Sequence, residues 1–256
     1  MNTKVVTGFI FLSALCLSCQ QRNSGEARSG ANPPAPGFDM AHSDPAAIEL
    51  ADSVMAAMGG RENWDKTRFI SWNFSGRRDL AWDKAEGNVR IESAPDSTIY
   101  LLNLNTRKGR VRIRGQELTE PDSLGKMLQR GKSIWINDSY WLLMPFKLKD
   151  TGVTLKYLGE DTTATGARCN VIQLTFQNVG DTPQNKYKVY VGLEDNLVKQ
   201  WAYYKEATQD SPSQVWPWDN YKKYGNILLS ADRSDNRGPR NVRIDNQLPA
   251  SLFSEF

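Results

Sequence analysis

The 256-residue chain contains 32 Lys and Arg, 29 Asp and Glu, one His and three Cys. Its composition, 39% hydrophobic, 10% aromatic and 24% charged, predicts a globular protein with a packed core and excludes a disordered or collagenous chain. At roughly 150 residues per domain, the length allows one large domain or two small ones. A net charge of +3 lacks the dense basic footprint of nucleic-acid binding, so nucleic acid is not an expected partner.

The chain begins with the features of an export signal: a short charged start, an apolar run over residues 5–17, and then Ser18-Cys19. The run is shorter than the roughly 20 residues that cross a bilayer as a helix, so a transmembrane anchor is not expected. Its end, Cys16-Leu17-Ser18-Cys19, resembles the bacterial lipoprotein cleavage box, with Cys16 in place of the usual leucine. We therefore expect residues 1–18 to be a lipoprotein signal peptide. Acyl groups on Cys19 would then anchor the protein in the cell envelope, on the outer membrane facing the periplasm.

Residues 19–43 are polar and rich in Gly, Ser and Pro, without a hydrophobic period. This composition predicts a disordered tether, followed by a single domain over residues 44–256. If Cys16 is removed and Cys19 is acylated, Cys169 is left alone and no internal disulfide can form. Cys169 lies in an alternating segment, where we favour a small buried hydrophobic residue over a nucleophile.

Two segments have helical spacing. Asp44-Pro45 is a typical helix start, and apolar residues recur until Met58, before Gly59-Gly60 ends the run. A helical insert of one or two helices is expected from Asp122 to about Leu143, with Asp122 as its cap.

Elsewhere the hydrophobic pattern has a period of two, as in Phe69–Trp82, which is typical of strands with one solvated face. Short Gly-, Asn- and Asp-containing connectors separate these segments, without the intervening helices of a parallel array. We predict an α+β fold in which a curved antiparallel sheet, an unclosed half-barrel of about ten strands, wraps over the N-terminal helix and the helical insert. Further strands are expected over residues 89–92, 98–104, 110–114, 154–158, 169–176, 186–191, 197–204, 226–232 and 242–248.

The residues that catalysis usually needs are missing from the expected domain. The single histidine, His42, lies in the expected tether, which excludes Ser-His-Asp and Cys-His catalysis and His-based zinc sites. The glycines of Gly125–Ser133 are too far apart for a phosphate loop. We predict no catalytic residue, no cofactor and no metal site, and an enzyme that uses carboxylates alone stays a minor alternative.

Arg110, Arg112 and Arg114 alternate with Val111 and Ile113, so the three guanidinium groups are expected on one face of one strand. A functional interpretation is a docking stripe for lipid phosphates or an acidic protein. An ordinary solvated face is the interpretation that we favour.

The eight tryptophans are unevenly spread, and the segment Trp135–Phe146 is the richest in apolar bulk. This segment is either the wall of a ligand pocket or plain core. The candidate ligand-binding residues are Trp72, Phe74, Trp135, Trp141, Leu142, Met144 and Phe146.

Several short motifs together resemble one family. They are Met58-Gly59-Gly60 with Trp64, Trp82-Asp83, Asn137–Leu148, and Ile244-Asp245-Asn246 with Leu252-Phe253. With them the chain resembles bacterial envelope lipoproteins that have the LolA/LolB-like lipoprotein-carrier fold. The resemblance implies an unclosed antiparallel barrel over helices, with acyl chains held in its apolar concavity, and it transfers no individual ligand contact.

We therefore expect a membrane-anchored lipoprotein that binds a lipid, an acyl chain or another hydrophobic ligand in the concave face, with a lipid or lipoprotein as its partner. One alternative is a non-catalytic envelope scaffold whose concavity is filled by its own helices. The other is a carbohydrate-binding lipoprotein, which needs Trp201, Trp216 and Trp218 on an exposed platform.

Overall fold

The computed structural model describes residue 1 and residues 32–177 and 179–256. The expected signal peptide, Cys19 and the first part of the expected tether lie outside the described residues. The described chain contains three helices, which are α1 (Pro45–Ala57), α2 (Arg61–Lys66) and α3 (Pro121–Leu143). Its short 3₁₀ helices are η1 (Ala94–Asp96), η2 (Met144–Lys147), η3 (Ser234–Asn236) and η4 (Ala250–Phe253).

The strands form antiparallel sheets that do not close into a barrel, so the predicted α+β class is confirmed. The sheet is divided, however. A seven-stranded sheet has the order β14 (Arg240–Asp245), β1 (Phe69–Phe74), β2 (Arg78–Asp83), β3 (Asn88–Ser93), β4 (Thr98–Asn103), β5 (Gly109–Ile113), β6 (Gln116–Glu117). A five-stranded sheet has the order β11 (Gln214–Pro217), β10 (Val198–Tyr204), β9 (Lys186–Gly192), β8 (Arg168–Phe176), β7 (Val153–Thr162), and β12 (Tyr221–Tyr224) pairs with β13 (Ile227–Ser230).

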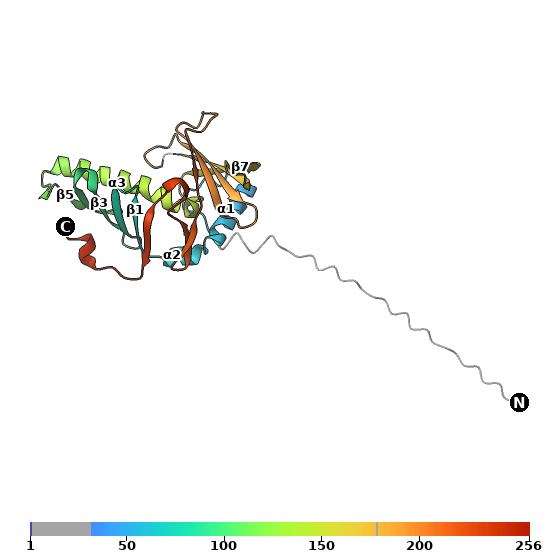
Figure 1. Ribbon diagram of the computed structural model, residues 1–256, viewed down its shortest axis with the longest axis horizontal. Helices are drawn as coiled ribbons and strands as arrows, with labels where there is room; N and C mark the ends of the chain where they lie inside the picture. The colour runs from blue at the N-terminus through green and yellow to red at the C-terminus, as the bar shows by residue number, and fades with distance from the viewer. Residues whose placement is uncertain (2–31, 178) are drawn as a thin grey trace.

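The mid-chain insert is a single helix, α3, which lies along one face of the seven-stranded sheet (Figure 1) and contacts β3, β4 and β5. Its N-cap is Glu120 rather than the expected Asp122. The carboxylate of Glu120 accepts hydrogen bonds from the backbone N–H groups of Asp122 and Ser123 at 3.0 and 2.7 Å, which satisfies two of the unpaired donors at the helix start.

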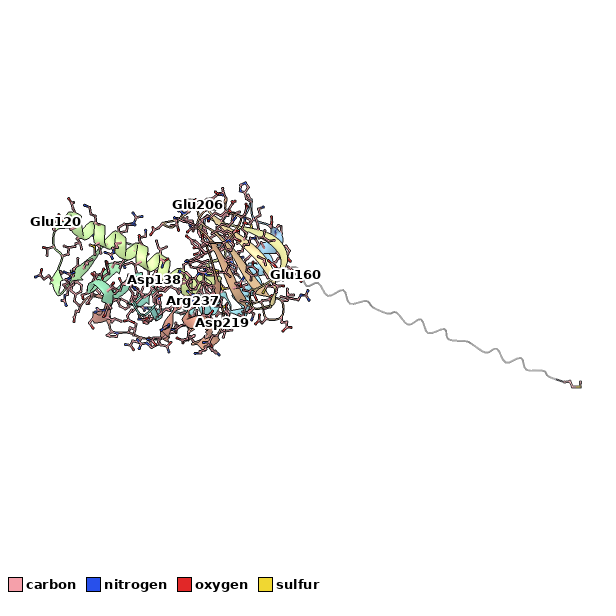
Figure 2. The ribbon with its side chains drawn as sticks, turned by 45° about the horizontal axis from the view of Figure 1, so that its top comes forward. Glu120, Asp138, Glu160, Glu206, Asp219 and Arg237 are labelled. Atoms are coloured by element: carbon pink, nitrogen blue, oxygen red, sulfur yellow. The ribbon has the colours of Figure 1, made fainter. Side chains whose placement is uncertain are left out.

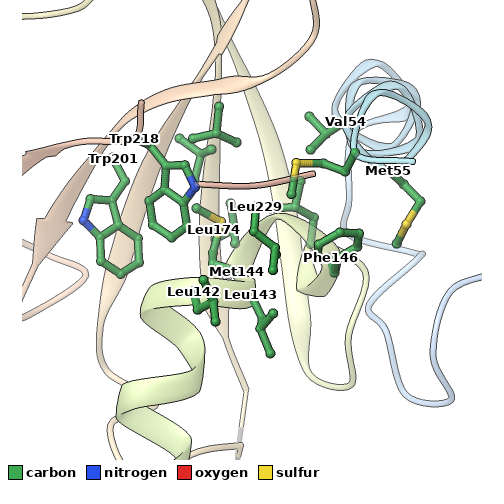
Figure 3. Close-up of a cluster of buried hydrophobic side chains, with 14 of the residues drawn as sticks. Val54, Met55, Leu142, Leu143, Met144, Phe146, Leu174, Trp201, Trp218 and Leu229 are labelled. Atoms are coloured by element: carbon green, nitrogen blue, oxygen red, sulfur yellow. The ribbon is translucent and has the colours of Figure 1, made fainter. Parts of the chain in front are cut away.

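The end of α3 enters the core between the two large sheets. Leu142, Leu143 and Met144 are at most 1% exposed. Figure 3 shows them between Val54 of α1 and the rings of Trp201 and Trp218. The sequence allows the segment Trp135–Phe146 to be either a pocket wall or core, and the structure places its second half, from Leu142 onward, in the core. The N-terminal helix α1 contributes its expected apolar stripe to this core, consisting of Ala47, Leu50, Ala51, Val54 and Met55.

A buried ion pair joins α3 to the sheet. The side chain of Asp138 is 0% exposed, and both of its oxygens accept hydrogen bonds from Arg78 of β2, at 2.7 and 2.9 Å. Figure 2 shows Asp138 near the middle of the molecule. Because a buried charge needs a partner, this two-pronged contact fixes where α3 lies on the sheet.

The domain begins earlier than predicted. Phe38, expected in the tether, is 8% exposed and belongs to the main core cluster. The backbone N–H groups of Ala35 and Asp39 donate to the carbonyl oxygens of Lys149 and Val153 at 2.9 and 3.0 Å. The tether boundary at residue 43 is thus wrong, because local composition cannot show that one aromatic side chain and the edge of a distant strand hold this polar segment.

None of the described helices is both long enough and apolar enough to span a bilayer. Cys169 is 0% exposed and makes no disulfide. Burial raises the pKa of its thiol, which agrees with a packing role and opposes reactivity.

Candidate functional site

A half-open cleft of about 330 Å³ lies between α3 and the five-stranded sheet. The second half of α3 forms one wall, and the end of β8, its connection to β9 and the start of β9 form the other. The volume falls at the lower end of the range for small-molecule sites, roughly 300–1,000 Å³. The apolar side chains that line it are Trp135, Ile136, Tyr140, Trp141, Val153, Phe176, Val179 and Tyr187.

Aromatic rings pack behind the cleft and hold its wall in place. The ring of Trp141 meets Trp201 and Trp216 edge-on, with centroids 4.6 and 5.0 Å apart. Tyr187 stacks on Trp201 at 4.9 Å. Each such pair adds about 0.5–1.5 kcal/mol beyond the burial of its area, so this wall is rigid.

Arg233 closes the far side of the aromatic cluster. Its guanidinium carbon lies 3.5 Å from the centroid of Trp218, and its Nη2 donates a hydrogen bond of 2.6 Å to the carbonyl oxygen of Trp141. Burial lowers the pKa of Arg233 to about 9. Arg233 therefore acts as a buried clamp on the last turn of α3, where helix carbonyl groups lack intrahelical partners.

The cleft lining carries little net charge. Lys147 and Asp150 form an ion pair with each other. Burial raises the pKa of Tyr140 and Tyr187 above the ordinary value, so both hydroxyls stay protonated at neutral pH. Among the described residues the buried hydroxyl of Tyr140 has no hydrogen-bond partner. The exposed carboxylate of Asp181 also lines the cleft. The site is thus a cleft of apolar and polar side chains with unionised phenols in its wall.

The structure separates the seven candidate ligand-binding residues. Trp135 and Trp141 line the cleft, and Phe74 packs against Trp141 with centroids 6.4 Å apart. The other four candidates are buried in the core rather than exposed to a ligand, because α3 and η2 fill the space between the sheets. They are Trp72, Leu142, Met144 and Phe146, each at most 5% exposed.

The three late tryptophans form no exposed platform. Trp201 and Trp218 are 1% and 0% exposed. The ring of Trp216 is half-buried, and the guanidinium carbon of Arg237 lies 3.8 Å from its centroid. A sugar ring therefore has no open row of indoles on which to stack.

The three arginines do not form one free stripe. Arg114 leaves the strand with a φ of +49°, in the turn after β5. Arg110 is paired with Glu117 at 2.6 Å. The guanidinium carbons of Arg110 and Arg112 lie 4.6 and 4.2 Å from the centroid of the Phe256 ring. The C-terminal residues of the chain thus cover part of the surface that the sequence predicts to be free.

The seven candidates omit six apolar residues of the cleft lining, which are Ile136, Tyr140, Val153, Phe176, Val179 and Tyr187. Ile136 is next to Trp135, but the helical pattern alone does not say which side of α3 faces the five-stranded sheet. Phe176 and Tyr187 lie at the facing ends of β8 and β9. Aromatic residues at the ends of successive predicted strands were a usable signal, since a hairpin brings such ends together.

No described group of three or more His, Cys, Asp or Glu side chains is arranged to hold a metal ion. No protein-family model matches the sequence, and no curated protein matches it.

Solved structures of low similarity do align with the chain. A DUF1329 family protein from Desulfovibrio piger has a TM-score of 0.42 and 14% identity, covering 82% of this chain and 98% of that one. A putative outer membrane lipoprotein-sorting protein domain from Vibrio parahaemolyticus has a TM-score of 0.38 and 10% identity, covering 81% and 96%. MucB has a TM-score of 0.25 and 13% identity, covering 73% and 66%. At these TM-scores the similarity carries no inference about function, which rests on the residues of this chain.

Proposed function

We propose that the protein is a membrane-anchored lipoprotein of the bacterial envelope that binds one acyl chain, or a hydrophobic ligand of similar size, in the cleft between α3 and the β8–β9 end of the five-stranded sheet. The observation that carries the proposal is the cleft itself, about 330 Å³, in which five aromatic and three aliphatic side chains line the wall together with polar ones. Removing apolar ligand surface from water contributes about 25 cal/mol per Å².

The composition of the cleft favours binding over catalysis. Its ionisable side chains are the mutually paired Lys147 and Asp150, the exposed carboxylate of Asp181 and the protonated phenols of Tyr140 and Tyr187. No nucleophile with an adjacent base is present among the described lining residues, and such a pair is what hydrolytic chemistry needs.

Membrane attachment through acyl groups on Cys19 is the second element of the proposal. Its support is the sequence alone, namely the apolar run over residues 5–17 followed by Ser18-Cys19. The outer membrane, facing the periplasm, is the location that we propose with it. Metabolic labelling with a radioactive fatty acid tests this element, and loss of label in Cys19→Ser is the expected result.

A scaffold that binds no small ligand is the second candidate function. The observation that favours it is the filling of the space between the sheets by Leu142, Met144 and Phe146, which are at most 5% exposed. The two candidates differ in whether the remaining cleft takes up an apolar molecule.

Binding of an environment-sensitive apolar fluorophore to residues 20–256 distinguishes them. All strands, helices and core residues described above lie within this range, so it carries its own core. We expect Ile136→Asp to weaken binding at least about tenfold, because an ionised carboxylate in the cleft opposes an apolar ligand. Ile136 lines the cleft but does not belong to the main core cluster, so the variant should stay folded.

Leu158→Asp is the matched control, since Leu158 is 44% exposed and lies outside the cleft. It should bind the fluorophore like the unchanged protein. Absence of any binding by the folded protein, or equal losses in both variants, contradicts the cleft as a ligand site and favours the scaffold. Organic extraction followed by mass spectrometry then identifies a ligand that co-purifies with the protein.

A further inference from the structure

The positive charge of the chain is concentrated at one end of the molecule. Residues 105–132, from the β4–β5 turn to the first half of α3, contain eight Lys and Arg and three Asp and Glu, a net charge of +5. The whole chain has a net charge of only +3, so the rest of it is net negative. We call the surface formed by residues 105–132 the basic end.

Most cations of the basic end are free. Arg110 and Arg130 pair with Glu117 and Asp96. The remaining six make no ion pair in the described part of the chain, and four of them are exposed, namely Arg107, Lys108, Arg114 and Lys126. Elsewhere in the described chain about half of the cations are paired, namely Arg61, Lys66, Arg68, Arg78, Arg90, Lys147, Lys149, Lys156, Arg168, Lys199 and Lys222.

We propose that the basic end is a docking surface for an anionic lipid surface, where it contacts the phosphates of the headgroups. Unpaired cations on a surface repel one another and gain free energy when anions approach, about 1 kcal/mol for each Lys or Arg near an anionic membrane. The free cations flank the edge of the seven-stranded sheet from both the strand side and the α3 side, which suits a broad layer of charge rather than a single ion.

The composition of the basic end favours a lipid surface over nucleic acid or a small anion. Residues 105–132 contain no Phe, Trp or Tyr, so the aromatic stacking platform of single-strand binding is missing. The hollow found at this end, next to Leu128 and Lys132, has a volume of only about 120 Å³. The contacts of the basic end with an anionic surface would therefore be diffuse and electrostatic.

The position of the basic end gives the contact a consequence for orientation, which rests on the proposed lipid anchor. Asn32, where the described domain begins, donates a hydrogen bond to Asp52 of α1. In Figure 1, α1 and β7 lie at one end of the long axis and β5 with the start of α3 at the other. The proposed anchor, Cys19, precedes Asn32 by only 13 residues in the sequence. An anchor at one end and cations at the other lay the long axis along the bilayer.

Vesicle binding of residues 20–256, which lack the proposed anchor, tests the surface directly. The two compositions are phosphatidylcholine alone and phosphatidylcholine mixed with phosphatidylglycerol, and binding is measured by flotation at low salt and at about 0.15 M salt. We expect binding to the anionic vesicles only, weakened by salt. Lys108→Glu/Lys126→Glu should weaken it at least about tenfold, because it replaces two exposed cations with anions. Neither side chain makes a hydrogen bond or ion pair with the described residues, so the variant should stay folded.

Lys205→Glu/Lys223→Glu makes the same change of charge at exposed positions outside the basic end and should bind nearly like the unchanged protein. Equal losses in the two double variants, or equal binding to both vesicle types, would overturn the proposal. Tighter binding to a DNA duplex than to the anionic vesicles at the same salt would also overturn it. The fluorophore assay with Ile136→Asp is independent of this surface, so failure of one proposal leaves the other distinguishable.

Discussion

At the scale of single residues, the most consequential contact is the one between Arg78 and Asp138. Burial raises the pKa of the Asp138 carboxyl, and the hydrogen bonds from Arg78 and Asn137 oppose this effect. The carboxylate has no contact with solvent, whereas Arg78 keeps 20% of its side chain exposed. The pair therefore specifies the position of α3 more than it adds net stability.

Asp138→Ala is expected to lower the free energy of unfolding by about 3–5 kcal/mol, because it leaves the guanidinium of Arg78 without its buried partner. Urea denaturation followed by tryptophan fluorescence measures the loss. The double variant Arg78→Met/Asp138→Leu should recover much of it, since no unpaired charge remains. A double variant as unstable as the single one contradicts this explanation.

A second residue-scale prediction concerns acid. Burial alone raises the pKa of Asp83, but hydrogen bonds from Arg68 and from the backbone N–H groups of Glu86 and Ala85 outweigh it, so the pKa is lowered. A carboxyl with a lowered folded-state pKa contributes stability that is complete above the unfolded-state pKa of about 3.9. This contribution is lost as the pH falls through the folded-state value.

We therefore expect Asp83→Asn to lower the free energy of unfolding at pH 6 and to make its decline below about pH 4 shallower. Urea denaturation over this pH range measures both effects. Asp210→Asn, at an exposed position, is the control and should keep the original slope. An unchanged slope in Asp83→Asn as well would refute the role of this carboxyl.

At the scale of elements, α3 shows how a helix can be shaped by its neighbour at the expense of its own propensity. Gly131 lies where a Cβ atom would come within 2.8 Å of Cδ1 of Tyr100, which is itself 0% exposed. Gly125, two turns earlier, has open space around the same position. The helix therefore approaches β4 closely at one glycine and not at the other.

The two glycines make a matched pair of variants. Gly125→Ala should stabilise the protein by about 0.5–1 kcal/mol, because alanine is the better helix former. Gly131→Ala should destabilise it by about 1–3 kcal/mol, because Tyr100 cannot move away from the added methyl group. Thermal unfolding measures both changes, and equal shifts in the same direction would argue against close packing at Gly131.

At the scale of the whole molecule, residues 32–43 belong to the domain and lie close to α1, where Asn32 donates a hydrogen bond to Asp52. The side chain of Phe38 inserts into the core and so holds residues 32–43 against the domain. The same residues contact the segment that follows η2, as in the bond from Ala35 to Lys149, and that segment also lines the cleft. The start of the domain and the wall of the candidate site are thus one packed unit.

Phe38→Ala is expected to lower the free energy of unfolding by about 3 kcal/mol, as for other buried aromatic side chains. Met40→Ala, two residues later and 50% exposed, should change it by less than about 0.5 kcal/mol. Chemical denaturation of residues 20–256 measures both. Similar small effects in the two variants would contradict the assignment of residues 32–43 to the folded domain.

The sequence by itself determined the features that depend on neighbours along the chain. The limits of α1, the period of two in the strands and the burial of Cys169 follow from local patterns. Only the tertiary structure decided the features that depend on residues far apart. Pairing of β14 with β1, the ion pair between Arg78 and Asp138, and the burial of Met144 beside the open cleft at Trp135 each require two distant segments to meet. Local hydrophobic periodicity predicts which face of a segment is buried, but not which distant segment packs against that face.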